Sequence, residues 1–154
     1  MTRPSGHAGP GLATPGAQCL GTHAFRLAFE PRGESPSNNA LFARAGSFIA
    51  PPHVVPAIGS DPTLGTSGQF LTIEARAGGS VLSALHRAED GNAVIVRLFN
   101  ADQEPASVRL RQHRPVAGAT MVDFLERPAG PLEVENGVVQ LDVGSFRIAT
   151  VRLT

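Results

Sequence analysis

The chain of 154 residues carries thirteen arginines, no lysine and thirteen acidic residues, so its formal charge is zero. Without a basic stripe it lacks the electrostatic footprint of a nucleic-acid-binding protein, and no nucleic-acid partner is expected. Its only aromatic residues are eight phenylalanines, and the absence of Trp and Tyr weighs against a module that stacks such rings on sugar faces.

The first half of the chain predicts few regular elements. Residues 1–21 are rich in Gly, Pro, Ser and Thr and are expected to form a flexible tail. His23–Glu30 alternates, with His23, Phe25, Leu27 and Phe29 on one face, which predicts a strand. Ala40–Phe48 is ambiguous between a short helix and irregular structure. Phe70–Ala75 again predicts a strand.

From Gly79 onward, turn signals recur about every ten residues, as in a small antiparallel sandwich. A domain is therefore expected over residues 80–154. Its predicted strands are Val81–Ala88, Ala93–Phe99, Ala106–Gln112, Ala119–Leu125, Pro131–Glu135, Val138–Val143 and Phe146–Leu153.

Two turn signals set testable registers. Asn136-Gly137 favours a two-residue type I′ loop, which would pair Val134 with Val139 and Leu132 with Leu141. Asp90-Gly91, or a four-residue loop from Glu89 to Asn92, would pair Leu85 with Val96 and Ser83 with Leu98. In the last strand the inward phase shifts between Ile148 and Val151, which predicts a bulge or bend near Ala149–Thr150.

No pattern in the chain predicts a catalytic or metal site. Gly65-Thr66-Ser67-Gly68 lacks the spacing of a nucleophile elbow, and Ser145 only follows a turn glycine. The possible metal ligands are scattered: His7, His23, His53, His86, His113 and Cys19. Most acidic residues, Glu126 among them, fall at turns or outward strand positions and predict solubility. Asp123 lies in an apolar strand, yet alternation lets it point outward.

Arg97 lies in a strand that is apolar on both faces. A guanidinium there either reaches toward an edge of the sheet or pairs with an acid or a carbonyl group. The residues themselves leave both interpretations open.

Two stretches carry a family resemblance. Val81–Asn100, with its Asp90-Gly91 turn and its Arg97-Leu98-Phe99-Asn100 end, and Thr14–Pro31 resemble parts of the β-region of family 38 glycoside hydrolases, the α-mannosidases. The resemblance implies an all-β fold, with an immunoglobulin-like or jelly-roll-like sandwich over residues 80–154. It also implies that residues 22–79 are a partial segment of a larger β-sandwich. One departure is Leu27-Ala28-Phe29, where the family often has Tyr-Ala-Leu.

The resemblance also implies a function. In this family the zinc ligands and the carboxylate nucleophile belong to an α/β catalytic domain, which nothing in this chain matches. We therefore expect an inactive C-terminal β-domain, fragment or subunit, whose partner is the catalytic domain of a mannosidase. No catalytic residue, metal site or cofactor is expected in the chain itself. The positions that match the family motif, and that the resemblance places near the parent active site, are Glu89, Asp90, Gly91, Arg97 and Asn100.

Alternatives remain open. The sandwich could instead be a stand-alone carbohydrate-binding module for mannosides, or an interaction module. Unpaired strand edges around His23–Glu30 would favour self-association. The lone Cys19 excludes an internal disulfide, and Met1–Leu20 lacks a continuous apolar core, so a cytoplasmic location is expected. No apolar run approaches the ~20 residues that span a bilayer, so no membrane partner is expected.

Overall fold

The computed structural model describes residues 19–56, 67–75 and 79–154. The chain divides into two units, residues 1–31 and residues 32–154. Most of the predicted tail lies outside the described residues. In the first unit, residues 19–31 form neither helix nor strand, so the strand predicted over His23–Glu30 is wrong. Alternation creates a strand only where a neighbouring strand accepts its backbone hydrogen bonds. The predicted self-association through this segment stays a prediction.

In the second unit, α1 (Asn38–Ile49) resolves the ambiguous stretch Ala40–Phe48 as a helix. Ser37 caps its start, because its side-chain oxygen accepts a hydrogen bond from the Ala40 amide at 3.2 Å. The helix ends before Pro51 and Pro52, which cannot continue it.

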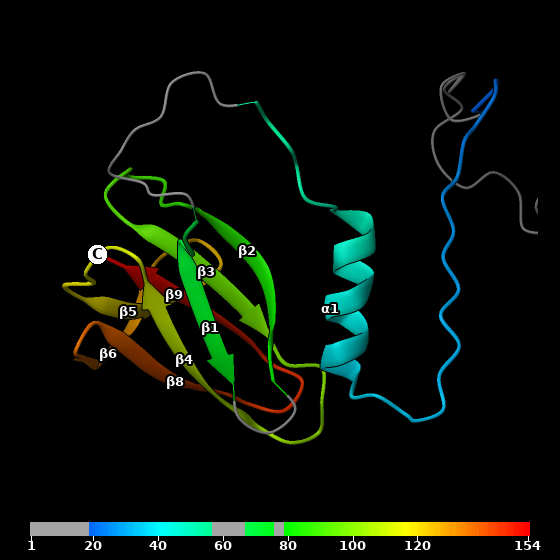
Figure 1. Cartoon of the computed structure of the whole chain (residues 1–154). Helices are drawn as coiled ribbons and strands as arrows, with labels where there is room; N and C mark the ends of the chain where they lie inside the picture. Colours follow the sequence, from blue (N-terminus) through cyan, green and yellow to red (C-terminus); the bar gives the residue numbers. More distant parts are fainter. Residues whose placement is uncertain (1–18, 57–66, 76–78) are drawn as a thin grey trace, which may run out of the picture. The chain divides into compact units, whose positions relative to one another are not determined.

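Nine antiparallel strands in two sheets lie within the described residues (Figure 1). The first sheet has four strands in the order β1-β4-β8-β7: Leu71–Ala75, Ala106–Gln112, Val138–Val143 and Val134–Glu135. The second has five strands in the order β2-β3-β9-β5-β6: Val81–Arg87, Val94–Phe99, Ile148–Leu153, Ala119–Val122 and Pro128–Leu132. The predicted all-β sandwich is confirmed, and β4 and β8 have the predicted bounds. The early strand β1 pairs with β4 and so belongs to this sandwich.

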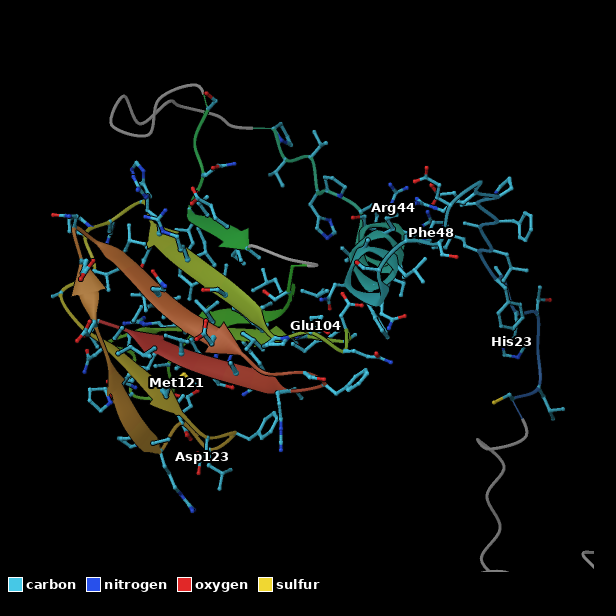
Figure 2. The ribbon with its side chains drawn as sticks, turned by 90° about the horizontal axis from the view of Figure 1, so that it is seen from below. His23, Arg44, Phe48, Glu104, Met121 and Asp123 are labelled. Atoms are coloured by element: carbon cyan, nitrogen blue, oxygen red, sulfur yellow. The ribbon has the colours of Figure 1, made fainter. Side chains whose placement is uncertain are left out.

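The core lies between the two sheets, and side chains of both fill the space between them (Figure 2). The five-stranded sheet contributes Val96, Leu98, Ala149, Val151 and Leu153, and the four-stranded sheet contributes Val108, Leu110, Val139, Leu141 and Val143. Each fully buried Val or Leu stabilises the fold by about 1.5–3 kcal/mol relative to an exposed one. Apolar residues at every second position give each sheet one apolar face, and the two sheets pack with these faces together.

The core is open along β2. Leu82 and Leu85 pair with Leu98 and Val96, so their side chains share the inner face of the sheet. They nevertheless remain 43% and 41% exposed. Neither leucine belongs to the buried core cluster, and β2 is an edge strand of the larger sheet.

The hairpin of β7 and β8 tests one predicted register. Asn136 and Gly137 have φ values of 51° and 73°, as a type I′ loop requires, and the pairing of Val134 with Val139 is confirmed. The pairing of Leu132 with Leu141 is wrong, since Leu132 pairs with Ala119 in the other sheet. The predicted strand Pro131–Glu135 is interrupted at Glu133, and its two halves join different sheets.

The hairpin of β2 and β3 tests the other register. The pairing of Leu85 with Val96 is confirmed, but Leu82 rather than Ser83 pairs with Leu98, because an irregularity between Leu82 and Ala84 inserts an extra residue. Of the bulge or bend predicted near Ala149–Thr150, the bulge is wrong. The register of β9 against β3 is unbroken, and Ile148 lies on the outer face, paired with Phe99. No change of inward phase is therefore needed.

Candidate functional site

The candidate site lies on the outer face of the five-stranded sheet. Val96 and Leu98 point into the core, so Ile95 and Arg97 of β3 point outward. The register adds His86 of β2, opposite Ile95, and Thr150 of β9, opposite Arg97. Ile95 is fully buried in a small cluster with Ala88 and Ala93.

A loop between β5 and β6, Asp123–Arg127, folds over this face. The Asp123 carboxylate accepts hydrogen bonds from the backbone N–H groups of Leu125 at 2.8 Å and Arg127 at 2.9 Å. The Asp123 amide also donates to the Arg127 carbonyl at 3.0 Å. These bonds end the strand at Val122 instead of Leu125. Asp123 therefore shapes a turn, as Asp side chains commonly do.

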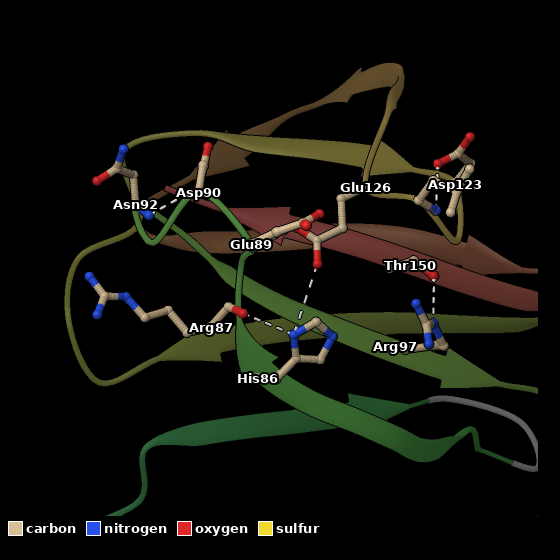
Figure 3. Close-up of polar contacts among 10 residues, drawn as sticks. His86, Arg87, Glu89, Asp90, Asn92, Arg97, Asp123, Glu126 and Thr150 are labelled. Atoms are coloured by element: carbon tan, nitrogen blue, oxygen red, sulfur yellow. Dashed lines mark hydrogen bonds and ion pairs between the residues drawn. The ribbon is translucent and has the colours of Figure 1, made fainter.

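Arg97 is held at two points. Its Nε donates to the Thr150 hydroxyl at 3.2 Å (Figure 3), and its guanidinium carbon lies 4.7 Å from the centre of the Phe124 ring. Among the described residues, no carboxylate lies within ion-pair distance of this guanidinium. A hydroxyl and an aromatic ring, rather than an acid or a carbonyl, therefore position the side chain.

Glu126 ties the same loop to the end of the β2–β3 hairpin. One of its carboxylate oxygens accepts a hydrogen bond from the Glu89 amide at 3.0 Å, and the other lies 4.0 Å from Nδ1 of His86. Nδ1 also lies 3.0 Å from the Arg87 carbonyl, which can only accept (Figure 3). The Glu126 side chain is only 16% exposed.

Asp90 fixes the hairpin turn. One carboxylate oxygen accepts a hydrogen bond from the Asn92 amide at 3.0 Å, and the other lies 2.5 Å from a guanidinium nitrogen of Arg152. The Asn92 amide and then Arg152 lower the pKa of Asp90. Gly91 has a φ of 77°, which favours glycine.

These side chains border a shallow hollow of about 350 Å³, lined by Glu89, Asp90, Leu125, Glu126 and Arg152. The carboxylates of Asp90 and Glu126 accept hydrogen bonds within the fold, which suits them to hold a turn and a loop together. The described parts of the chain contain no group of three or more His, Cys, Asp or Glu that could hold a metal ion.

The segment that carries this face can be compared with known families. Residues 80–151 match the family model described as Glycosyl hydrolases family 38 C-terminal beta sandwich domain. The predicted relationship to family 38 is confirmed for this segment. No curated protein matches the chain. Within the described ranges, no helix is both long enough and apolar enough to cross a membrane.

Within residues 80–151, called the family 38 segment below, the five motif positions lie in two separate places. Glu89, Asp90 and Gly91 form the hairpin end, and Arg97 lies on the same sheet, joined to them by the loop Asp123–Arg127. Asn100 lies elsewhere, buried directly after β3. Its Nδ2 donates to the Glu104 carbonyl at 2.7 Å, and it also contacts the end of β8.

Sequence reasoning missed two residues of the family 38 segment, Phe124 and Glu126. The sequence alone places Phe124 inside a strand and groups Glu126 with the acidic residues that favour solubility. The available signal was Asp123 followed by Pro128, which favours a turn after Val122. Of the other candidates, His7 and Gly65-Thr66 lie outside the described residues.

Proposed function

We propose that this chain is an accessory β-domain that supports the catalytic domain of an α-mannosidase-like glycoside hydrolase, and that it has no hydrolase activity of its own. The observation that carries the proposal is the match of residues 80–151 to the C-terminal β-sandwich of family 38. The partner would be the catalytic domain, either in the same enzyme or as a separate chain.

The chemistry of the outer face supports an accessory role. Glycoside hydrolysis commonly uses two carboxylates about 5–10 Å apart, one as a proton donor and one as a nucleophile or base. Asp123 and Glu126 instead accept backbone N–H groups of the fold, and Asp90 binds Asn92 and Arg152. These three carboxylates therefore have structural partners already.

The divalent metal expected for the family, usually zinc, belongs in this proposal to the catalytic domain. The described residues do not offer a ligand set for it. No step of the proposed role passes through a metal in this chain. The cytoplasmic location stays a prediction.

One experiment separates support from catalysis. The full chain, incubated with an aryl α-mannoside and zinc, should show no turnover. Added to a family 38 catalytic domain that lacks its own C-terminal β-sandwich, it should raise the melting temperature of that domain, because binding to the folded state stabilises it. Turnover by the chain alone that survives purification and is lost in Asp123→Asn would contradict the proposal.

One observation favours a second candidate, a carbohydrate-binding module. The hollow beside the hairpin turn combines Asp90, Glu126 and Arg152 with the apolar Leu125, and such groups can bind sugar hydroxyls and an apolar ring face. Calorimetry with methyl α-mannoside would test it. This candidate requires a millimolar or tighter dissociation constant that weakens in Leu125→Ala, and heat no greater than dilution would eliminate it.

A further inference from the structure

We infer that Arg97 is the anchor through which this domain docks, and that it receives a carboxylate from the catalytic domain. The inference rests on the proposed function and names the surface that function would use. This surface, called the Arg97 surface below, consists of Arg97, Thr150, Phe124 and Ile148.

The guanidinium of the Arg97 surface is pre-organised. Thr150 is buried and accepts the Nε hydrogen bond at 3.2 Å, while the Phe124 ring covers one face of the guanidinium at 4.7 Å. These contacts engage Nε and the planar face, and within the described ranges no hydrogen bond or ion pair engages the two terminal nitrogens. An arginine held this way loses less side-chain entropy when it binds than a free one does.

The charge of Arg97 lacks a complement among the described residues. The other outward cation of this sheet, Arg152, pairs with Asp90, and Arg109 on the four-stranded sheet lies 3.8 Å from Glu74. Arg97 has no such carboxylate in the described ranges. The two free terminal nitrogens match the two oxygens of one Asp or Glu side chain. Charge complementarity therefore indicates an acidic residue on the partner.

Apolar side chains adjoin this cation. Phe124 is 63% exposed and Ile148 is 53% exposed. Ile148 lies two residues before Thr150 on the same face of β9. Arginine beside exposed aromatic and aliphatic side chains is the composition of the central part of protein interfaces, where the apolar groups exclude water from the ion pair. The expected occupant is a segment of the catalytic domain that presents a carboxylate among apolar residues.

The test uses the full chain and a family 38 catalytic domain that lacks its own C-terminal β-sandwich. Binding is measured for the wild type, Arg97→Gln, Phe124→Ala and the matched control Arg109→Gln, which removes an exposed guanidinium from the other sheet. We expect Arg97→Gln to raise the dissociation constant about tenfold or more, Phe124→Ala to raise it several-fold, and Arg109→Gln to leave it within about twofold.

A second measurement needs no mutation. Hydrogen exchange of the wild-type chain, with and without the catalytic domain, should show protection of Asp123–Arg127 and of β9 in the complex. It therefore decides the question even if Arg97→Gln unfolds the domain. Protection confined to β4 and β8, or equal binding by Arg97→Gln and Arg109→Gln, would overturn the inference while the supporting function stands.

Two further outcomes would leave the Arg97 surface with a different occupant or with none. Absence of binding by the wild type would overturn the proposed function, and the inference with it. If the loop Asp123–Arg127 becomes protected in the chain alone as its concentration rises, the occupant is a second copy, and the assignment to a catalytic domain is wrong.

Discussion

The side-chain amide of Asn39 donates a hydrogen bond to the side-chain oxygen of Asn100 at 2.8 Å, and both residues are buried. Asn39 also donates to the Gly79 carbonyl at 2.8 Å and accepts from the Ala101 amide at 2.7 Å. This pair joins the first turn of α1 to the chain that follows β3. Buried side-chain amides of this kind stabilise the fold most when each of their polar atoms has a hydrogen-bond partner.

Replacing Asn39 should weaken the attachment of α1 to the segment that follows β3. Asn39→Ala leaves the Gly79 carbonyl and the Ala101 amide without this partner, so we expect a loss of about 1–3 kcal/mol in the free energy of unfolding. Exchange of the α1 amides should accelerate as well. The control Ser47→Ala removes a hydroxyl bonded only to the Ala43 carbonyl of the same helix and should change stability little. Helix exchange unchanged in Asn39→Ala would contradict this prediction.

The lowered pKa of Asp90 predicts an acid-dependent contribution to stability. Because its folded pKa lies below the ordinary 3.8, the contribution is complete above that value and is lost as the pH falls through the folded pKa. The stability difference between wild type and Asp90→Asn should thus be constant between about pH 5 and 8 and shrink below about pH 4. Denaturant titrations at several pH values measure it. Arg152→Gln should show a weaker acid dependence than wild type, and a difference that persists undiminished to about pH 2 would refute the assignment.

The difference in burial between two neighbouring leucines predicts a difference in how much stability each loses when it is replaced by alanine. Leu98 is fully buried, so Leu98→Ala should cost about 2–5 kcal/mol. Leu85 lies on the adjacent strand with its side chain 41% exposed, so Leu85→Ala should cost no more than about 1 kcal/mol. Urea unfolding of both variants decides the matter, and equal losses would mean that the inner face of β2 is covered in solution.

The β7–β8 loop predicts a contrast between two glycines. Gly137 has a φ of 73°, where an alanine side chain is strained, so Gly137→Ala should destabilise by about 1–2 kcal/mol. Gly130 in β6 has no positive φ, and an added Cβ would meet no atom within 4 Å. Gly130→Ala should therefore be neutral or slightly stabilising. Similar melting temperatures for the two variants would count against the type I′ turn.

Local patterns predicted the strands in which apolar and polar residues clearly alternate. β4 and β8 were bounded correctly because Val108, Leu110, Val139 and Leu141 alternate with polar residues, and Asn136-Gly137 allows one register. The same reasoning failed at Ser83, where a bulge shifts the pairing, and over His23–Glu30, which alternates without a partner strand. A strand is a property of two segments, and the sequence of one does not contain the other.

The candidate site was less predictable for a related reason. Arg97 was singled out because a charge interrupts an apolar strand, but its actual contacts, Thr150 and Phe124, are 53 and 27 residues away along the chain. They meet only because β9 pairs with β3 and the β5–β6 loop folds back over the sheet. No local pattern encodes that meeting.

Leu82 and Leu85 expose apolar side chains on β2, an edge strand whose backbone is hydrogen-bonded to a neighbouring strand along one side only. An edge strand that exposes apolar side chains can pair with a second chain, so warming or concentrating the protein should start self-association at β2. A single Leu85→Lys change would place a charged side chain on this edge of the sheet while the buried core stays intact.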